Sequence, residues 1–282
     1  MKNLVLIAIS LLFILTGCDR QQPPKEIDLD TIYDTLPSYD AQSCYPYDSF
    51  STLFDKSFYY LNNLPAQKID REFAQIYYES NFEKKALYLD YENNLILSKS
   101  KEKNSSTTRS LIAQSEPWFT SQTHYFVSQV RAFKPKTLQR YSFMQAHGVF
   151  KQDANRSIYY NYPLVDIRWE REYDDRYDHL WAVIIKSSPS DDEPKIYDWV
   201  DLGARQDNHF SLEVHIAHNI LEVKVDYKTK YIQNVSYWER VPTYFSAGVI
   251  LNSYIDGGEA GVSFKELRFE NDAANVENIT HF

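Results

Sequence analysis

The side chains best suited to chemistry in this sequence are those that transfer protons. The chain has 23 tyrosines and 7 histidines, and either side chain can act as a general acid or base. Of the histidines, His215 shares the outward face of a predicted strand with Glu213, whereas His218 falls at a predicted turn. Further candidates are His147, His179 and His209. All five are also compatible with ordinary surface positions, so the residue types alone predict no reaction.

Other kinds of catalytic site lack their sequence signatures. No Gly-x-Ser-x-Gly motif supports a serine nucleophile. No His-x-x-x-His pair or cysteine cluster indicates a metal site, so we expect neither a metal nor another cofactor. The run Glu26-Ile27-Asp28-Leu29-Asp30 resembles the carboxylate strand of laminarinase-type glucanases, but it lacks the final Glu. It also lies in a polar linker, so we interpret it as part of a solvated acidic tether.

The first 17 residues have the features of an export signal. Lys2 precedes an apolar run, Leu4–Leu15, which is shorter than the roughly 20 residues that span a bilayer. The run ends in Leu15-Thr16-Gly17-Cys18, which resembles a bacterial lipobox and implies cleavage before Cys18 and lipidation of its thiol. An ordinary signal peptide or an uncleaved anchor is the alternative. A lipidated cysteine implies a protein of the bacterial cell envelope; Asp19 favours the periplasmic face of the inner membrane, with the outer membrane also open.

Composition indicates how the rest of the chain is organised and which partners it disfavours. Residues 18–44 are polar, acidic and Pro-containing and are expected to form a lipidated tether, with one domain over 45–282. If Cys18 carries lipid, Cys44 has no intramolecular partner, so the exported fold depends on its core. The net charge of −9 disfavours nucleic acid, and an anionic polysaccharide would need a local basic patch. We expect a monomer.

From His124 onward the sequence indicates a succession of β-strands. The clearest is a hairpin over Phe210–Asp226, where apolar and polar residues alternate on both sides of a His218-Asn219 turn. We predict an all-β fold, a sandwich or jelly roll with a curved groove. A short helix is expected over Ile69–Tyr78 and a polar loop over Lys99–Ser110. Five further strands are expected at Tyr125–Arg131, Gln139–Met144, Leu164–Trp169, Leu180–Ile185 and Lys195–Val200.

Several stretches in the second half of the chain carry a family resemblance. YFSAGVILN (244–252) is similar to a signature strand YFKAGxYxQ, residues 200–226 to the sheet segment before it, and GVSFKELRF (261–269) to the closing strand. Upstream, LQRYSFMQ (138–145) takes the place of an Arg-Ser/Thr-Glu-Leu-Arg strand and LWAVIIK (180–186) that of a Gln-Ile-His strand. Together, over roughly residues 120–270, they resemble the alginate lyases of polysaccharide lyase family seven. The resemblance implies a concanavalin A-like jelly roll.

The chemistry implied by the resemblance is β-elimination at a uronate. The proton alpha to a carboxylate is removed, so an Arg and a Gln or Asn must neutralise that carboxylate. A Tyr or His takes the proton and a Tyr protonates the leaving oxygen. On this alignment Arg140 matches the leading Arg, but Ser142 and Met144 replace the Glu and the second Arg. Residues 180–186 supply neither the Gln nor the His.

The signature strand keeps its shape but loses its reactive side chains. Ser246 stands where the family has Lys, Ile250 where it has the catalytic Tyr, and Asn252 near the final Gln. Strand alternation places the even-numbered residues on one face, so Ile250 is expected to point into the groove. An isoleucine transfers no proton, which predicts that the usual site is lost. The retained residues are Tyr244, Phe245, Ala247 and Gly248.

Substitute site residues can still be named. Arg140, His215 and Tyr254 are the candidates for catalysis. Aromatic rings provide flat faces for sugar stacking, although they also fill cores. The substrate-binding candidates are Arg140, Tyr244, Ser246, Asn252, Trp181 and Trp238.

Three functions remain open. The first is a lyase-like lipoprotein that binds a polysaccharide or envelope partner in its groove, with the lyase site lost. The second is an active polysaccharide lyase with a relocated acid/base, which predicts a Tyr or His near Arg140 across an open groove. The third is a structural envelope protein, which predicts that Ile250, Val183 and Ile185 pack under a loop.

Overall fold

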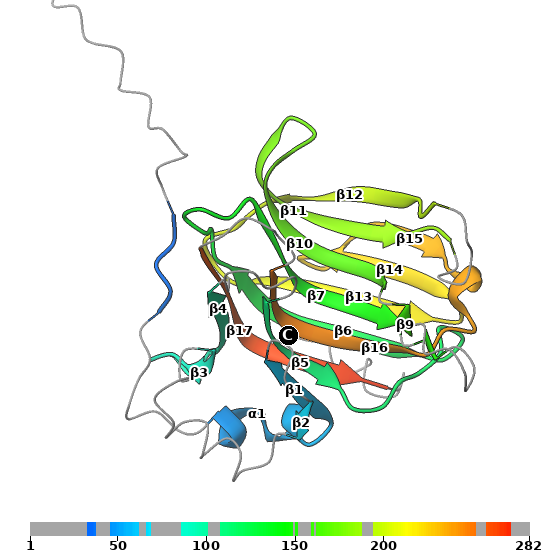
Figure 1. The fold of residues 1–282 in the computed structure, drawn as a ribbon, viewed down its shortest axis with the longest axis horizontal. Coiled ribbons are helices and arrows are strands. Elements are labelled where there is room, and N and C mark those ends of the chain that lie inside the picture. The colour runs from blue at the N-terminus through cyan, green and yellow to red at the C-terminus, as the bar shows by residue number, and fades with distance from the viewer. Residues whose placement is uncertain are drawn as a thin grey trace, which may run out of the picture. The chain divides into compact units, whose positions relative to one another are not determined.

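The fold is a β-sandwich (Figure 1). The computed structural model describes residues 33–37, 46–61, 66–68, 86–100, 108–148, 150–151, 159–160, 162–187, 194–251 and 258–271. Within them, two large antiparallel sheets and one two-stranded ribbon contain almost all of the regular structure. The predicted all-β jelly-roll class is confirmed. In this part of the chain, no helix is both long and apolar enough to cross a membrane.

Each large sheet combines strands that are distant in the sequence. The eight-stranded sheet has the order β12 (Tyr197–Ala204), β11 (Arg176–Ile185), β10 (Pro163–Tyr173), β7 (Arg140–Gly148), β16 (Thr243–Leu251), β5 (Thr108–Gln114), β1 (Ser57–Leu61) and β2 (Gln67–Lys68). The seven-stranded sheet has the order β15 (Lys228–Asn234), β14 (Ile220–Val225), β13 (Phe210–Ala217), β6 (His124–Ala132), β17 (Glu259–Glu270), β4 (Leu95–Ser100) and β3 (Leu87–Leu89). The smaller elements are α1 (Pro46–Phe54), the 3-10 helix η2 (Ser236–Trp238), and the ribbon of β8 (Phe150–Lys151) and β9 (Tyr159–Tyr160).

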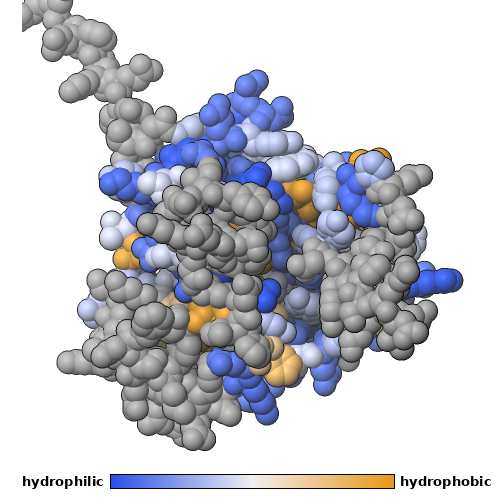
Figure 2. Space-filling view, in the orientation of Figure 1, coloured by the Kyte–Doolittle hydropathy of each residue, from blue (hydrophilic) through white to orange (hydrophobic). Residues whose placement is uncertain are grey.

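The core lies between the two sheets and follows from alternation along the strands. On β13, Leu212, Val214 and Ile216 are fully buried, and they pack in one cluster with residues of the opposite sheet such as Phe245 of β16. Most of the described surface on the face shown in Figure 2 is hydrophilic, with apolar residues only in small separate patches. The apolar side of each strand is therefore used mainly for the core.

The strand predictions in the second half are confirmed. The structure has β6, β7, β10, β11 and β12 at the five predicted places, and β13 and β14 form the predicted hairpin. His218 and Asn219 at its turn have φ values of 51° and 63°, as a tight two-residue turn requires. The predicted polar loop is wrong at both ends, because residues 99–100 belong to β4 and 108–110 to β5. The helix expected over Ile69–Tyr78 lies outside the described residues.

A short segment before the predicted domain also contacts the sandwich. Asp34, in residues 33–37, accepts hydrogen bonds from Arg131 (3.2 Å), the backbone N–H of Lys134 (2.8 Å) and Arg205 (3.0 Å). The Arg205 side chain is only 6% exposed, so this ion pair is largely shielded from water. Contacts with the domain thus begin ahead of residue 45, within the stretch that the sequence assigns to the tether. The export signal, Cys18 and Cys44 lie outside the described residues.

Candidate functional site

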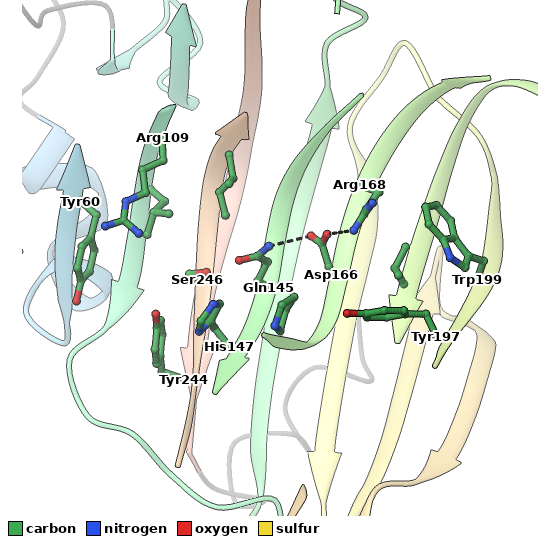
Figure 3. Close-up of a pocket in the computed structure, with 14 residues that line it drawn as sticks. Tyr60, Arg109, Gln145, His147, Asp166, Arg168, Tyr197, Trp199, Tyr244 and Ser246 are labelled. Carbon is green, nitrogen blue, oxygen red and sulfur yellow. Dashed lines mark hydrogen bonds and ion pairs between the residues drawn. The ribbon is translucent and has the colours of Figure 1, made fainter. Parts of the chain in front are cut away.

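The candidate site is a cavity of about 340 Å³ on the outer face of the eight-stranded sheet (Figure 3). It crosses seven strands, and one of its lining residues is Pro163 at the start of β10. By strand, the other lining residues are Tyr60 of β1, Arg109 and Leu111 of β5, Tyr244, Ser246 and Ile250 of β16, Gln145 and His147 of β7, Asp166 and Arg168 of β10, Val183 of β11, and Tyr197 and Trp199 of β12.

The signature strand β16 contributes its even-numbered side chains to this cavity. Tyr244, Ser246 and Ile250 line it, whereas Phe245 and Val249 are buried in the core between the sheets. The predicted orientation of Ile250 is therefore confirmed. Its side chain is 8% exposed and packs on Leu111, which makes a small apolar floor beside the polar groups.

Gly248 allows β16 to approach β5 closely. Its φ is +141°, and an added Cβ would lie 2.2 Å from the backbone oxygen of Ser110. No other residue fits at this position without moving backbone. On its other side, β16 loses regular pairing with β7 between Ala247 and Ile250, so the irregularity falls where the strand crosses the cavity.

Strand β7 brings an amide and an imidazole into the cavity. Gln145 pairs directly with Ser246, and His147 pairs directly with Tyr244 across β7 and β16. Opposed residues on neighbouring strands project side by side, and the His147 and Tyr244 rings have centroids 5.5 Å apart. The Nδ1 of His147 lies 3.0 Å from the carbonyl oxygen of Gly148, which can only accept a hydrogen bond. Nδ1 therefore carries the proton in the neutral ring, and Nε2 carries the lone pair.

Strand β5 brings a cation to the opposite side of β16. Arg109 pairs with Ile250, and its guanidinium carbon lies 5.3 Å from the ring centroid of Tyr60 on β1. A guanidinium in this position can bind a carboxylate while it contacts the aromatic face. The side of the cavity at the left of Figure 3 is thus formed by Tyr60, Arg109, His147 and Tyr244.

Burial keeps the phenol groups of this cluster protonated. It raises the pKa of Tyr244 to about 12, with a further contribution from Tyr60 that Arg109 partly offsets. Burial also raises the pKa of Tyr60, and Arg109 again acts in the opposite direction. At neutral pH Tyr244 is therefore a proton donor rather than a base.

A buried carboxylate lies at the middle of the cavity. Asp166 is 2% exposed and accepts hydrogen bonds from Ser142 (2.9 Å), Gln145 (3.1 Å) and Arg168 (Figure 3). Because its carboxylate has three donors, it holds the Gln145 amide with nitrogen toward Asp166. The second hydrogen of that nitrogen remains as a potential donor to a bound ligand.

The sequence candidates are divided by the structure. Tyr244 and Ser246 line the cavity, whereas Arg140 is exposed at the start of β7, pairs with Glu170 and does not line it. His215 belongs to the other sheet and forms ion pairs with Glu213 (2.9 Å) and Glu222 (3.7 Å). Neither Arg140 nor His215 can therefore take part in chemistry in this cavity.

The two tryptophan candidates lie beneath the surface. Trp238 is fully buried in the core and donates a hydrogen bond to Thr243 at 2.9 Å, so its prediction as a ligand contact is corrected. Trp181 is 3% exposed and packs edge-on against Trp199, which itself lines the cavity. Tyr254 and Asn252 lie outside the described residues.

The structure changes the alignment of the two upstream motifs. Residues 180–185 belong to β11, which β10 and β7 separate from β16, so this stretch is not the neighbour of the signature strand. The strands that flank β16 are β7, with Gln145-Ala146-His147, and β5, with Arg109-Ser110. Gln145-Ala146-His147 matches the Gln-Ile-His motif, and Arg109-Ser110 matches the start of the Arg-Ser/Thr-Glu-Leu-Arg motif. Both matches are better than those of residues 180–186 and 138–145, which the spacing along the sequence had suggested. The Gln-x-His triplet was the signal that sequence reasoning missed.

The comparisons with known structures agree with this architecture. The alginate lyase AlyC3 is 16% identical, with a TM-score of 0.64 over 83% of this chain and 99% of that one; another AlyC3 structure contains dimannuronate. The alginate lyase PA1167 from Pseudomonas aeruginosa is 18% identical, with a TM-score of 0.59 over 78% of this chain and 99% of that one. At these identities the likeness concerns the fold.

The sequence comparison identifies the family directly. A comparison with curated protein sequences gives no match. The sequence profile described as alginate lyase, in contrast, matches residues 61–271. That range contains every residue that lines the cavity except Tyr60. Because the profile spans most of the 282 residues, the chain belongs to the alginate lyase family.

Proposed function

We propose that this protein binds a uronate-containing polysaccharide in the cavity and cleaves it by β-elimination. The observation that carries the proposal is the convergence of Arg109, Gln145, His147 and Tyr244 on one cavity from three adjacent strands. A cation, an amide donor, an imidazole and a protonated phenol are the groups that this reaction needs.

The roles follow from the chemistry of each group. Arg109 and the free N–H of Gln145 bind the uronate carboxylate and stabilise the charge that develops when the alpha proton leaves. Nε2 of His147 takes that proton, the carbon–carbon double bond forms, and the bond to the leaving sugar oxygen breaks. Tyr244 donates its proton to that oxygen, and the imidazolium then returns a proton to the phenolate, 5.5 Å away between ring centroids. His147 and Tyr244 end in their starting states.

Binding without cleavage is the second candidate, and a specific observation favours it. Ile250 occupies the place of the family's catalytic Tyr, opposite Arg109, and Ser246 occupies that of its Lys. With these substitutions the groove would hold a uronate polymer through Arg109 and Gln145 and leave the chain intact.

The experiment that separates the two uses the purified full chain in detergent. Alginate and other uronate polymers are incubated with it, and the ultraviolet absorbance of the unsaturated product is followed beside affinity electrophoresis in gels containing the same polymers. Product formation that Arg109→Ala abolishes supports cleavage. Retarded migration without product supports binding alone, and neither signal contradicts both.

We further propose that the protein acts from the bacterial cell envelope, anchored through a lipid on Cys18. The support is the sequence Leu15-Thr16-Gly17-Cys18 after a short apolar run. Cys18→Ser should move the protein from the membrane fraction to the soluble fraction of lysed cells, or leave an unprocessed precursor. An unchanged size and membrane association in the variant would contradict the lipid anchor.

A further inference from the structure

The half of the cavity formed by β10, β11 and β12 has a different chemistry from the cluster around His147. Its described lining residues are Pro163, Asp166, Arg168, Val183, Tyr197 and Trp199. Three strand spacings of about 4.8 Å separate β7 from β12, so this half extends roughly 14 Å from Gln145. That length accommodates a sugar next to the one held by Arg109.

This half has no spare positive charge among its described residues. Its one cation, Arg168, donates to Asp166 and lies 3.6 Å from Glu170. Even with Glu170 protonated, the carboxylate of Asp166 alone neutralises Arg168. A second sugar carboxylate placed here would meet Asp166 without a free cation to bind it.

The same half offers aromatic surface instead. Tyr197 is 38% exposed at the rim of the cavity. Trp199 stacks on Tyr173 with ring centroids 4.0 Å apart, and Trp181 packs edge-on against both rings. The guanidinium carbon of Arg168 also lies 5.0 Å from the ring centroid of Trp199. These neighbours fix Trp199 in place, so the rim is pre-organised before a ligand arrives. The aromatic surface open to a ligand is therefore Tyr197 and the part of Trp199 that Tyr173 and Arg168 leave uncovered, and it favours the apolar face of a sugar ring over a charged group.

We infer that the substrate is a heteropolysaccharide in which a uronate is flanked by a neutral sugar. The uronate lies at Arg109, Gln145 and His147, and the neutral sugar lies against Tyr197 and Trp199. A polymer made only of uronates would place a carboxylate beside Asp166 in a partly buried groove. This inference rests on the proposed function and adds the class of polymer that the groove selects.

The test compares polymers made only of uronates with polymers in which a uronate is flanked by neutral sugars. Alginate is uronate throughout; hyaluronan alternates glucuronate with an N-acetylated sugar, and gellan combines glucuronate with neutral sugars. The full chain is assayed on each for product absorbance, and binding is measured by tryptophan fluorescence. We expect hyaluronan or gellan to be cleaved with a kcat/KM at least about tenfold above that for alginate.

Two variants assign the preference to this half of the groove. Tyr197→Ala should reduce the ratio of kcat/KM for the mixed polymer to kcat/KM for alginate by roughly tenfold. The matched control Tyr91→Ala, outside the groove, should not change this ratio. Asp166→Asn should free Arg168 and improve the use of alginate relative to the mixed polymers.

The outcomes separate this inference from the proposed cleavage. Equal or better cleavage of alginate, with no effect of Tyr197→Ala on preference, would overturn the inference and leave the lyase function standing. If no polymer is cleaved, the proposed cleavage fails, and the fluorescence titrations decide the inference: tighter binding of the mixed polymers supports it, and equal or tighter binding of alginate overturns it.

Discussion

His147 of β7 and Tyr244 of β16 are directly opposed across neighbouring strands, with ring centroids 5.5 Å apart and both side chains in the same cavity. The residues are separated by almost 100 positions in the chain, so only the sheet brings them together. Their partners Gln145 and Ser246 are opposed in the same register two residues along. A shift of one residue in this pairing would turn one set toward the core.

His147→Ala should abolish most product formation. Loss of a general base lowers the rate about 100- to 10,000-fold, and no other histidine lines the cavity among the described residues. The matched control is His215→Ala on the other sheet, which should retain the wild-type rate. Equal rates for wild type and His147→Ala, with both folded by circular dichroism, would exclude His147 as the base.

Arg109→Ala should weaken both binding and cleavage, whereas Arg140→Ala should affect neither. Arg109 faces the cavity, and Arg140 lies outside it beside Glu170. Removal of a group that stabilises the developing charge lowers the rate about 100- to 1,000-fold. Product absorbance and affinity electrophoresis on the two variants provide the measurement. Loss of binding and cleavage in Arg140→Ala but not in Arg109→Ala would instead support Arg140 as the arginine that binds the carboxylate.

Ile250→Tyr should increase cleavage, or create it if the wild-type protein only binds. The side chain already points into the cavity opposite Arg109, where a phenol would provide an additional acid or base. We expect a gain of about 100-fold or more in product formation. Ile250→Phe has the same bulk without the hydroxyl and should give no gain. A similar result for both variants would mean that the position is structural.

His124 should make the fold sensitive to acid. The ring stacks on Trp118 at 4.3 Å and is 6% exposed, and burial lowers its pKa from 6.5 to about 4, with an opposing hydrogen bond to Asn271. Between these two pH values the unfolded chain takes up a proton and the folded chain does not, so stability falls as the pH is lowered. The loss contributed by this residue is about 3 kcal/mol by pH 4.

The measurement is denaturant unfolding at several pH values from 7 to 4.5. His124→Phe keeps a ring against Trp118 and should show a shallower loss of stability than the wild type. His218→Asn changes an exposed histidine at a turn and should show the same dependence of stability on pH as the wild type. Parallel curves for wild type and His124→Phe would show that His124 titrates normally in the folded state.

Much of the fold could be predicted because strand periodicity is local. The alternation in Phe210–Asp226 predicted a hairpin, and the structure has β13 and β14 there. The same alternation correctly placed Ile250 on the cavity side of β16. The prediction failed at Lys99–Ser110, whose polar composition concealed the start of β5 and therefore Arg109. Polar residues at the start of a strand look the same as residues of a loop.

The sequence by itself determined the class of fold, the family and the face on which each residue of the signature strand lies, because these depend on patterns within short stretches. Only the tertiary structure decided which strands flank β16, since sheet order does not follow chain order. That order makes Arg109, Gln145 and His147 neighbours of Tyr244, and leaves Arg140 and His215 outside the cavity. Long-range strand pairing depends on packing between distant segments, and no local pattern encodes it.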